Sequence, residues 1–133
     1  MTQGSAPEAP IGVASYPRPA PIDAYGNGGF RFAEMSHRGS LLVLPNGIFA
    51  WDVDGPDDLT LDALRPALEA VAPPGFILLG TGAAQVFPDI AVRGAFVEAG
   101  VGLEPMSTGA ACRTFNVLLA EQRNVAAALI AVD

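Results

Sequence analysis

The chain has 133 residues, a mass of 13.7 kDa, 50% hydrophobic residues and a net charge of −7, which suits one domain with a core of its own. No apolar run reaches the length of about 18 residues that a membrane span needs, and the acidic balance argues against nucleic acid as a partner. All seven basic residues are arginine, which excludes lysine chemistry and favours a bacterial source rich in GC.

Residues 1–20 contain four prolines among alanine, glycine and serine and have almost no periodic apolar pattern. This composition predicts a flexible tail, with the folded domain beginning at residue 21. The tail lacks the basic and apolar regions of a signal peptide, and the single cysteine favours a reducing compartment. We therefore expect a cytoplasmic protein whose domain folds without residues 1–20.

Two β-hairpins are expected next. Glycine and asparagine occupy residues 26–29, and Pro45-Asn46-Gly47 separates two apolar runs. Asn-Gly between apolar runs is the strongest short-range signal for a hairpin. The four strands expected around these turns are residues 22–25, 30–34, 37–44 and 48–52.

The rest of the chain alternates between strands and helices. Thr60 is a plausible N-cap, and Pro66 is expected to kink or split the helix that follows it. Expected helices cover residues 60–71, 89–99 and 107–123, and expected strands cover residues 76–79, 103–106 and 125–132. Short links between them imply parallel strands with crossover helices. The fold class is therefore α/β, with three layers, a central mixed sheet and N-terminal β-hairpins.

The glycine loop at residues 80–84 resembles a dinucleotide-binding fingerprint, with Glu104 in place of the acidic residue that binds ribose. Gln85 stands where the fingerprint has glycine or alanine. Pro88 also delays the start of the following helix, so a bound phosphate would lose the helix dipole. A structural turn at the end of a buried strand explains these glycines better.

Two other motifs also favour structural roles. Residues 52–58 resemble half a calcium loop, but Asp57 and Ala63 stand where the loop needs glycine and glutamate. Cys112 and His37, each the only residue of its type, could form a nucleophilic pair, yet Cys112 lies between Ala111 and Arg113 on a predicted helix. We expect Cys112 to be a packing residue, and we expect no metal site.

The helix from Ser107 carries Arg113 and Asn116 on the side away from its apolar face. A guanidinium and an amide one turn apart can clamp an anion, a carboxylate or a backbone segment, and a solvated face is the alternative. Adjacent parallel strands end at the same edge of a sheet, so residues 80–82 should lie beside the start of this helix. A ligand site and a purely structural junction both remain open there.

Four segments together resemble one known family in order and spacing. They are residues 76–82, 102–108, 111–118 and 121–127, and the likeness extends over residues 21–133. The family is the Mth-type domain of unknown function, which includes small bacterial and archaeal proteins and a mitochondrial assembly factor for the alpha subcomplex of respiratory complex I. The resemblance implies a three-layer α/β fold and a protein-binding module, and it implies no catalytic residues.

The leading hypothesis is a non-enzymatic domain that binds a protein partner, without a cofactor, and assists the assembly of a membrane or respiratory complex. The alternative is a domain, or an unrecognised enzyme, that binds a small molecule or an anion at the strand ends. The candidate binding residues for a ligand or partner are Gly80, Thr81, Gly82, Ser107, Thr108, Arg113 and Asn116.

Overall fold

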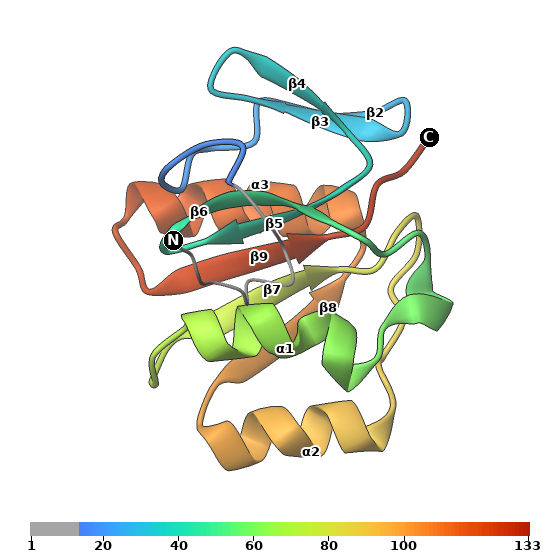
Figure 1. Cartoon of the computed structure of the whole chain (residues 1–133), viewed down its shortest axis with the longest axis vertical. Coiled ribbons are helices and arrows are strands. Elements are labelled where there is room, and N and C mark those ends of the chain that lie inside the picture. The colour runs from blue at the N-terminus through green and yellow to red at the C-terminus, as the bar shows by residue number, and fades with distance from the viewer. Residues whose placement is uncertain (1–13) are drawn as a thin grey trace, which may run out of the picture.

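The computed structural model describes residues 14–133, which form two sheets and three α-helices (Figure 1). In chain order the strands and helices are β2 (Ala24–Gly26), β3 (Gly29–Phe32), β4 (Met35–Arg38), β5 (Ser40–Leu44), β6 (Gly47–Trp51), the 3₁₀ turn η2 (Pro56–Asp58), α1 (Leu61–Ala70), β7 (Phe76–Gly80), α2 (Ile90–Ala99), β8 (Gly102–Met106), α3 (Thr108–Ala120) and β9 (Val125–Leu129).

The larger sheet is mixed, with strand order β6-β5-β9-β7-β8. The strand β7 pairs in parallel with β8 and β9, whereas β5 pairs antiparallel with β6 and β9. The helix α2 connects β7 to β8, and α3 connects β8 to β9. The predicted fold class, an α/β domain with a central mixed sheet and crossover helices, is confirmed.

The two faces of the larger sheet each bury a separate apolar cluster. Side chains alternate along a strand, so Ile77 and Leu79 face one side of the sheet and Leu78 faces the other. The first cluster also includes Leu64 of α1 and Phe96 of α2. In the second cluster, Phe115 of α3 packs with residues of β3. The helices α1 and α2 therefore cover one face of the sheet, and α3 covers the other (Figure 1).

The smaller sheet has strand order β2-β3-β4 and packs on the side of α3. Its first turn contains Asn27 and Gly28, both with positive φ, as a two-residue hairpin turn requires. The predicted single strand over residues 37–44 is wrong, because Gly39 (φ +92°) divides it between the two sheets. A glycine adopts this conformation without strain, so the chain can leave one sheet and enter the other.

The helix α1 runs without a break from Leu61 to Ala70, so Pro66 does not split it, contrary to that part of the expectation. Leu64 and Ala67, on either side of Pro66, are fully buried in the core. Tertiary packing of this kind holds a helix together despite the backbone hydrogen bond that a proline removes. The predicted N-cap is confirmed, since the Thr60 side chain accepts a hydrogen bond from Ala63 N at 3.2 Å.

The ends of α2 and α3 are set by local signals. Asp89 caps α2 by accepting a hydrogen bond from Val92 N at 3.1 Å, and Gly100 (φ +73°) ends it, as the sequence predicts. Ser107 caps α3. This helix ends at Ala120 and not near Arg123, because Gln122 turns the chain with φ +59° and Arg123 N donates to Leu118 O at 3.0 Å.

Residues 1–13 of the predicted tail lie outside the described residues, whereas residues 14–20 contact the domain. Ser15 N donates to Ile48 O at 2.7 Å, and Ile48 N donates to Tyr16 O at 2.9 Å, which forms an antiparallel bridge to β6. The Tyr16 ring lies edge-on to Phe32, and Ala20 is buried. The first contacts with the domain therefore precede the predicted boundary at residue 21.

Candidate functional site

The structure brings the predicted strand-end segments together. The register of β7 and β8 pairs Gly80 with Met106, so the loop after β7 lies beside the start of α3. A Cβ atom on Gly80 would lie 3.0 Å from the Cα and Oγ1 atoms of Thr108, which explains why glycine is needed at this approach. Sequence reasoning anticipated this proximity, because parallel strands end at one edge of a sheet.

Thr108 links the loop, the helix and β9. Its hydroxyl group is fully buried, accepts a hydrogen bond from Gly82 N at 3.0 Å and donates one to Ile130 O at 2.7 Å. Thr108 N in turn donates to Gly82 O at 2.8 Å. These bonds occupy the Thr108 hydroxyl and the first backbone N–H of α3, which would otherwise face a ligand.

Thr81 and Ser107 have local partners as well. The Thr81 hydroxyl accepts a hydrogen bond from Val86 N at 2.9 Å and donates to Ala84 O at 2.6 Å, so it folds the loop back on itself. The Ser107 hydroxyl accepts from Ala110 N at 3.4 Å, as a helix cap does. The polar groups at the junction thus hold the loop and the helix in place.

A cavity of about 490 Å³ lies beside the loop after β7. Its lining joins Thr81 and Gly82 to the turn before η2 and to the segment after β9, and the charged side chains in the lining are Asp54 and Asp133. Two carboxylates and no arginine make the cavity unsuited to an anion. Its size is within the range of cavities that hold small ligands.

Arg113 and Asn116 have different surroundings. The Asn116 side chain donates from Nδ2 to Ile22 O and accepts at Oδ1 from Ile22 N, both at 2.8 Å. Of the partners considered for this amide, the structure therefore supplies a backbone segment. The Arg113 side chain is exposed, and no carboxylate of residues 14–133 lies within ion-pair distance of it.

Among the hydrogen bonds of residues 14–133, none joins Cys112 to His37, so the two do not form a catalytic pair there. Cys112 is buried on α3, and burial raises the pKa of its thiol from 9.0 to about 12, although the charge of Arg113 opposes the shift. A thiol that stays protonated is a poor nucleophile. His37 Nε2 donates to Ser40 O at 3.0 Å. The expectation that Cys112 is a packing residue agrees with this burial.

The other two motifs have structural roles in residues 14–133. Asp58 accepts a hydrogen bond from Asp54 N at 3.0 Å and so shapes the turn around η2. No group of three or more His, Cys, Asp or Glu side chains in this part of the chain is arranged to hold a metal ion. After the glycine loop, α2 begins only at Ile90, so no helix starts within the loop to receive a phosphate.

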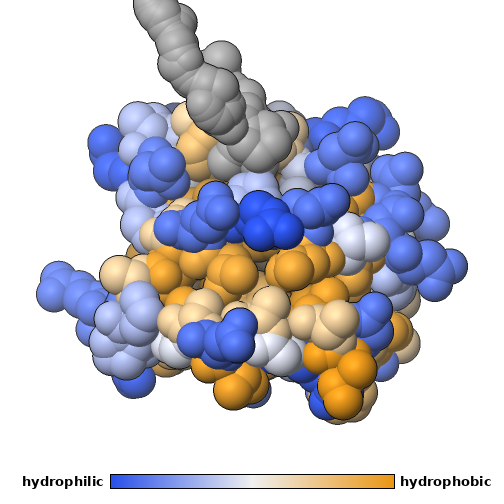
Figure 2. Space-filling model, turned by 60° about the horizontal axis from the view of Figure 1, so that its bottom comes forward, coloured by the Kyte–Doolittle hydropathy of each residue, from blue (hydrophilic) through white to orange (hydrophobic). Residues whose placement is uncertain are grey.

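Sequence reasoning missed an apolar surface on the outer side of α2. Ile90 and Val97 lie two turns apart on one side of the helix and are 76% and 81% exposed, and Phe87 just before the helix is 62% exposed. We call Phe87, Ile90 and Val97 the α2 surface. Figure 2, which looks toward the side at the bottom of Figure 1, shows apolar side chains over much of this side, with some polar side chains among them. The signal in the sequence was a helix with apolar residues on its outer as well as its inner side and with only Arg93 and Glu98 charged.

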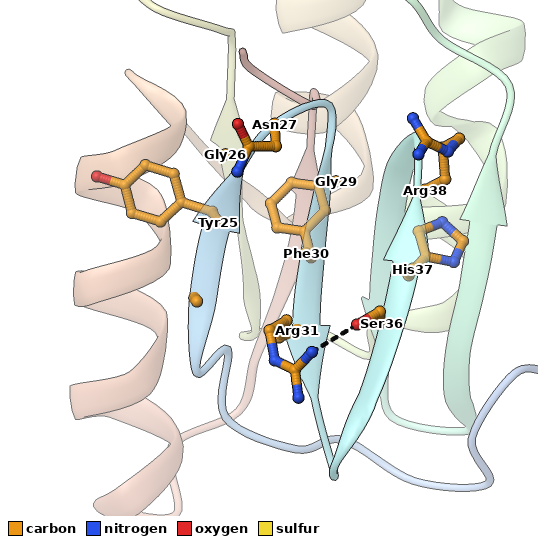
Figure 3. A pocket seen from close by; sticks show the side chains of 10 residues that line it. Tyr25, Gly26, Asn27, Gly29, Phe30, Arg31, Ser36, His37 and Arg38 are labelled. Carbon is orange, nitrogen blue, oxygen red and sulfur yellow. Dashed lines mark hydrogen bonds between the residues drawn. The ribbon is translucent and has the colours of Figure 1, made fainter.

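Sequence reasoning also missed a pocket on the smaller sheet, shown in Figure 3. It has a volume of about 430 Å³, and Arg31 and Arg38 contribute to its lining. The two arginines could not be assigned to one site from the sequence alone, because their meeting depends on the register between β3 and β4.

Comparison with known proteins identifies relatives along most of the chain. An uncharacterised protein of Rhodobacter capsulatus is 46% identical over 115 residues, which are 83% of each chain. The NADH dehydrogenase [ubiquinone] 1 alpha subcomplex assembly factor 3 of Danio rerio is 32% identical over 82% of this chain. The alignment spans 63% of the length of that factor.

Solved structures show the same fold. A crystal structure of an outer membrane protein from Bartonella henselae is 48% identical, has a TM-score of 0.81 and covers 89% of this chain and 99% of its own. A solution structure from Bordetella pertussis, described as a Mth938-like domain, is 26% identical with a TM-score of 0.72 and covers 98% of this chain and 92% of its own. In residues 14–133, no helix is both long enough and apolar enough to cross a membrane.

The family model that matches covers residues 22–130 and is described as a protein of unknown function (DUF498/DUF598). The resemblance to the Mth-type domain family drawn from the sequence is therefore confirmed. The chain belongs to the DUF498/DUF598 family.

Proposed function

We propose that this chain is a non-enzymatic domain that binds a protein partner through the α2 surface and assists the assembly of a membrane or respiratory complex. The observation that carries the proposal is the exposure of Ile90 and Val97 on one side of α2, together with that of Phe87 just before the helix. Exposed apolar side chains that gather into one patch mark interaction surfaces in soluble proteins.

The composition of α2 supports this role. Val92 and Phe96 are buried and attach the helix to the sheet, so the outer side chains are not needed for the core. Arg93 and Glu98 are the charged residues of the helix, and both are exposed. An apolar centre with charged residues at its edge is the usual composition of a protein interface.

The names of the relatives support one type of partner. The vertebrate relatives are named as assembly factors of the NADH dehydrogenase alpha subcomplex, and they share 32% identity with this chain in zebrafish and in human. An assembly factor must bind the subunits that it assembles. By this likeness, we infer that the partner is a protein subunit of a respiratory complex. The single cysteine, which favours a reducing compartment, supports binding in the cytoplasm.

The test is affinity purification of the tagged full chain from cells of its source, followed by quantitative mass spectrometry. Ile90→Glu with Val97→Glu places two charges in the α2 surface, and Val117→Glu places the same charge on the exposed side of α3, where Val117 is 58% exposed. The partner should be recovered with the unaltered chain and with Val117→Glu, and it should be depleted at least about tenfold with the double variant.

Recovery of the same partner with the double variant would contradict the proposal. Unchanged thermal unfolding of both variants is the control for folding, because all three positions are exposed. Restoration of the assembled NADH dehydrogenase complex on native gels, in cells that lack the gene, tests the assembly role separately.

A second candidate function is small-molecule binding at the junction of the glycine loop and α3. The cavity of about 490 Å³ beside Thr81 and Gly82 favours it, and its two carboxylates favour a neutral or cationic ligand over the anion first considered. Amide NMR shifts that cluster at residues 80–83 and 107–109 during titration would support this function. Shifts scattered over the surface would indicate that the junction is purely structural and binds no ligand.

A further inference from the structure

The smaller sheet carries a pocket whose charge is opposite to that of the whole chain. The chain has 14 acidic residues and a net charge of −7, yet none of the ten residues lining this pocket is acidic. The lining holds two of the chain's seven arginines, Arg31 and Arg38. The pocket is therefore a cationic region on an acidic protein.

The register of the sheet brings the two arginines to one face. Arg31 of β3 pairs with Ser36, and Arg38 of β4 pairs with Gly29, so both arginines project from the exposed face of the sheet, two residues apart along it. Diagonal neighbours of this kind lie about 7–8 Å apart at their Cα atoms. In Figure 3 the two guanidinium groups point toward opposite ends of the pocket, so one small ligand contacts both only after Arg38 changes rotamer, which its exposure allows.

Glycines keep the space beside Arg38 open. Gly29 pairs with Arg38 on one side and with Gly26 on the other, so this row of the sheet has one side chain among three residues. A Cβ atom at Gly29 would overlap the His37 carbonyl oxygen, so the close approach of β3 and β4 requires glycine there. The result is a concave surface of about 430 Å³ with backbone as its floor and Asn27 at its rim (Figure 3).

The donors of the arginines remain largely free. Arg31 Nη1 donates to Ser36 Oγ at 2.7 Å, which orients its guanidinium group and leaves its other N–H groups available. In residues 14–133, no carboxylate lies within 4.0 Å of Arg31 or Arg38. His37 faces the other side of the sheet and donates to Ser40 O, so it supports the strand and is not counted among the ligand-binding groups.

We propose that this pocket binds a small oxyanion, through the guanidinium groups of Arg31 and Arg38. Carboxylate and phosphate groups both match the paired donors of a guanidinium, and two such groups on adjacent strands suit a ligand with two or more negative charges. The site is separate from the α2 surface, so binding there does not depend on the protein partner.

The test is titration of the full chain by amide NMR with inorganic phosphate and, in a second arm, with succinate, at constant ionic strength. The variant is Arg31→Gln with Arg38→Gln. The matched control is Arg123→Gln, which removes an exposed arginine beyond the C-terminal end of α3. We expect saturable shifts at residues 26–38 with at least one of the two anions, retained in the control and weakened about tenfold or more in the double variant.

Binding of phosphate alone or of succinate alone identifies which oxyanion the pocket takes, and both results support the proposal. Shifts that never saturate with either anion, or that are equal in the double variant and the control, overturn it. The peak pattern of the free double variant, compared with that of the control, reports whether the sheet has kept its fold. If the double variant is misfolded, Arg38→Gln alone is titrated and must weaken binding relative to Arg123→Gln.

Discussion

The hydroxyl group of Thr108 connects three parts of the molecule that are far apart in sequence. It is fully buried, with a donor from the glycine loop and an acceptor at Ile130. Thr108→Val keeps the shape and removes both bonds, which leaves Gly82 N and Ile130 O without this partner. We expect the free energy of unfolding to fall by about 2 kcal/mol in chemical denaturation.

The matched comparison for Thr108 is its neighbour Ser107. The Ser107 cap bond is long, at 3.4 Å, and the residue is half-buried. Ser107→Ala should therefore cost about 1 kcal/mol or less. Equal losses for the two variants would contradict the special role given to Thr108.

The Cys112 thiol should react slowly in the folded chain and rapidly after unfolding, because it is 2% exposed and its pKa is raised to about 12. The raised pKa also predicts a pH effect. The stabilisation from the protonated buried thiol is complete below pH 9.0, the ordinary pKa, and is lost as the pH rises toward 12. Unfolding curves of the chain and of Cys112→Ala should therefore converge, or cross in favour of Cys112→Ala, above pH 9. Rapid labelling of the native chain would contradict the packing role.

For the residues of the candidate site, the sequence predicted which segments lie side by side better than it predicted which groups form hydrogen bonds. Parallel strand order was enough to place Gly82 near Thr108. The partner of Asn116 was not accessible in this way, because Ile22 lies 94 residues earlier in the chain. The same limit applies to Arg31 and Arg38, whose shared face depends on strand register.

At the scale of elements, the Asn116 amide attaches the segment before β2 to α3. Its two hydrogen bonds to Ile22 mimic the pairing of a neighbouring strand. Asn116→Ala should lower the free energy of unfolding by about 1–3 kcal/mol and speed hydrogen exchange at the Ile22 amide. Arg113→Ala, one turn away and exposed, should change stability by less than about 0.5 kcal/mol. Unchanged exchange at Ile22 in Asn116→Ala would count against this attachment.

The N-terminal segment gives a second test at this scale. A chain that starts at Ala14 keeps the bridge between Tyr16 and Ile48, and a chain that starts at Pro21 loses it together with the burial of Ala20. We expect the shorter chain to unfold at a temperature lower by roughly 5 °C or more. Equal melting temperatures would show that residues 14–20 do not stabilise the domain, as the boundary predicted at residue 21 implies.

Local signals account for most element boundaries. The Asn27-Gly28 turn, the Thr60 cap and the Gly100 stop act within a few residues, so they could be read directly from the sequence. The division of residues 37–44 at Gly39 and the continuity of α1 through Pro66 depend on packing between distant segments. Local propensity carries no information about such packing.

At the scale of the whole molecule, the exposed apolar side chains of the α2 surface and the positively charged pocket of Arg31 and Arg38 lie in different parts of the fold. The α2 surface belongs to the layer on one face of the larger sheet, and the arginine pocket belongs to the smaller sheet on the other side (Figures 1 and 3). This separation predicts that disrupting one leaves the other intact. Arg31→Gln with Arg38→Gln should therefore not reduce recovery of the protein partner. A loss of partner equal to that of Ile90→Glu with Val97→Glu would show that the two sites work as one.

Site-specific photocrosslinking in the native cells is the sharpest test of whether a protein partner contacts the α2 surface. A photoreactive phenylalanine analogue replaces Val97 in one chain and Val117 in another, since both side chains are exposed on helices that cover opposite faces of the sheet. We expect a discrete crosslinked product from position 97 and none of that mass from position 117. The same product from both positions, or from position 117 alone, would contradict it.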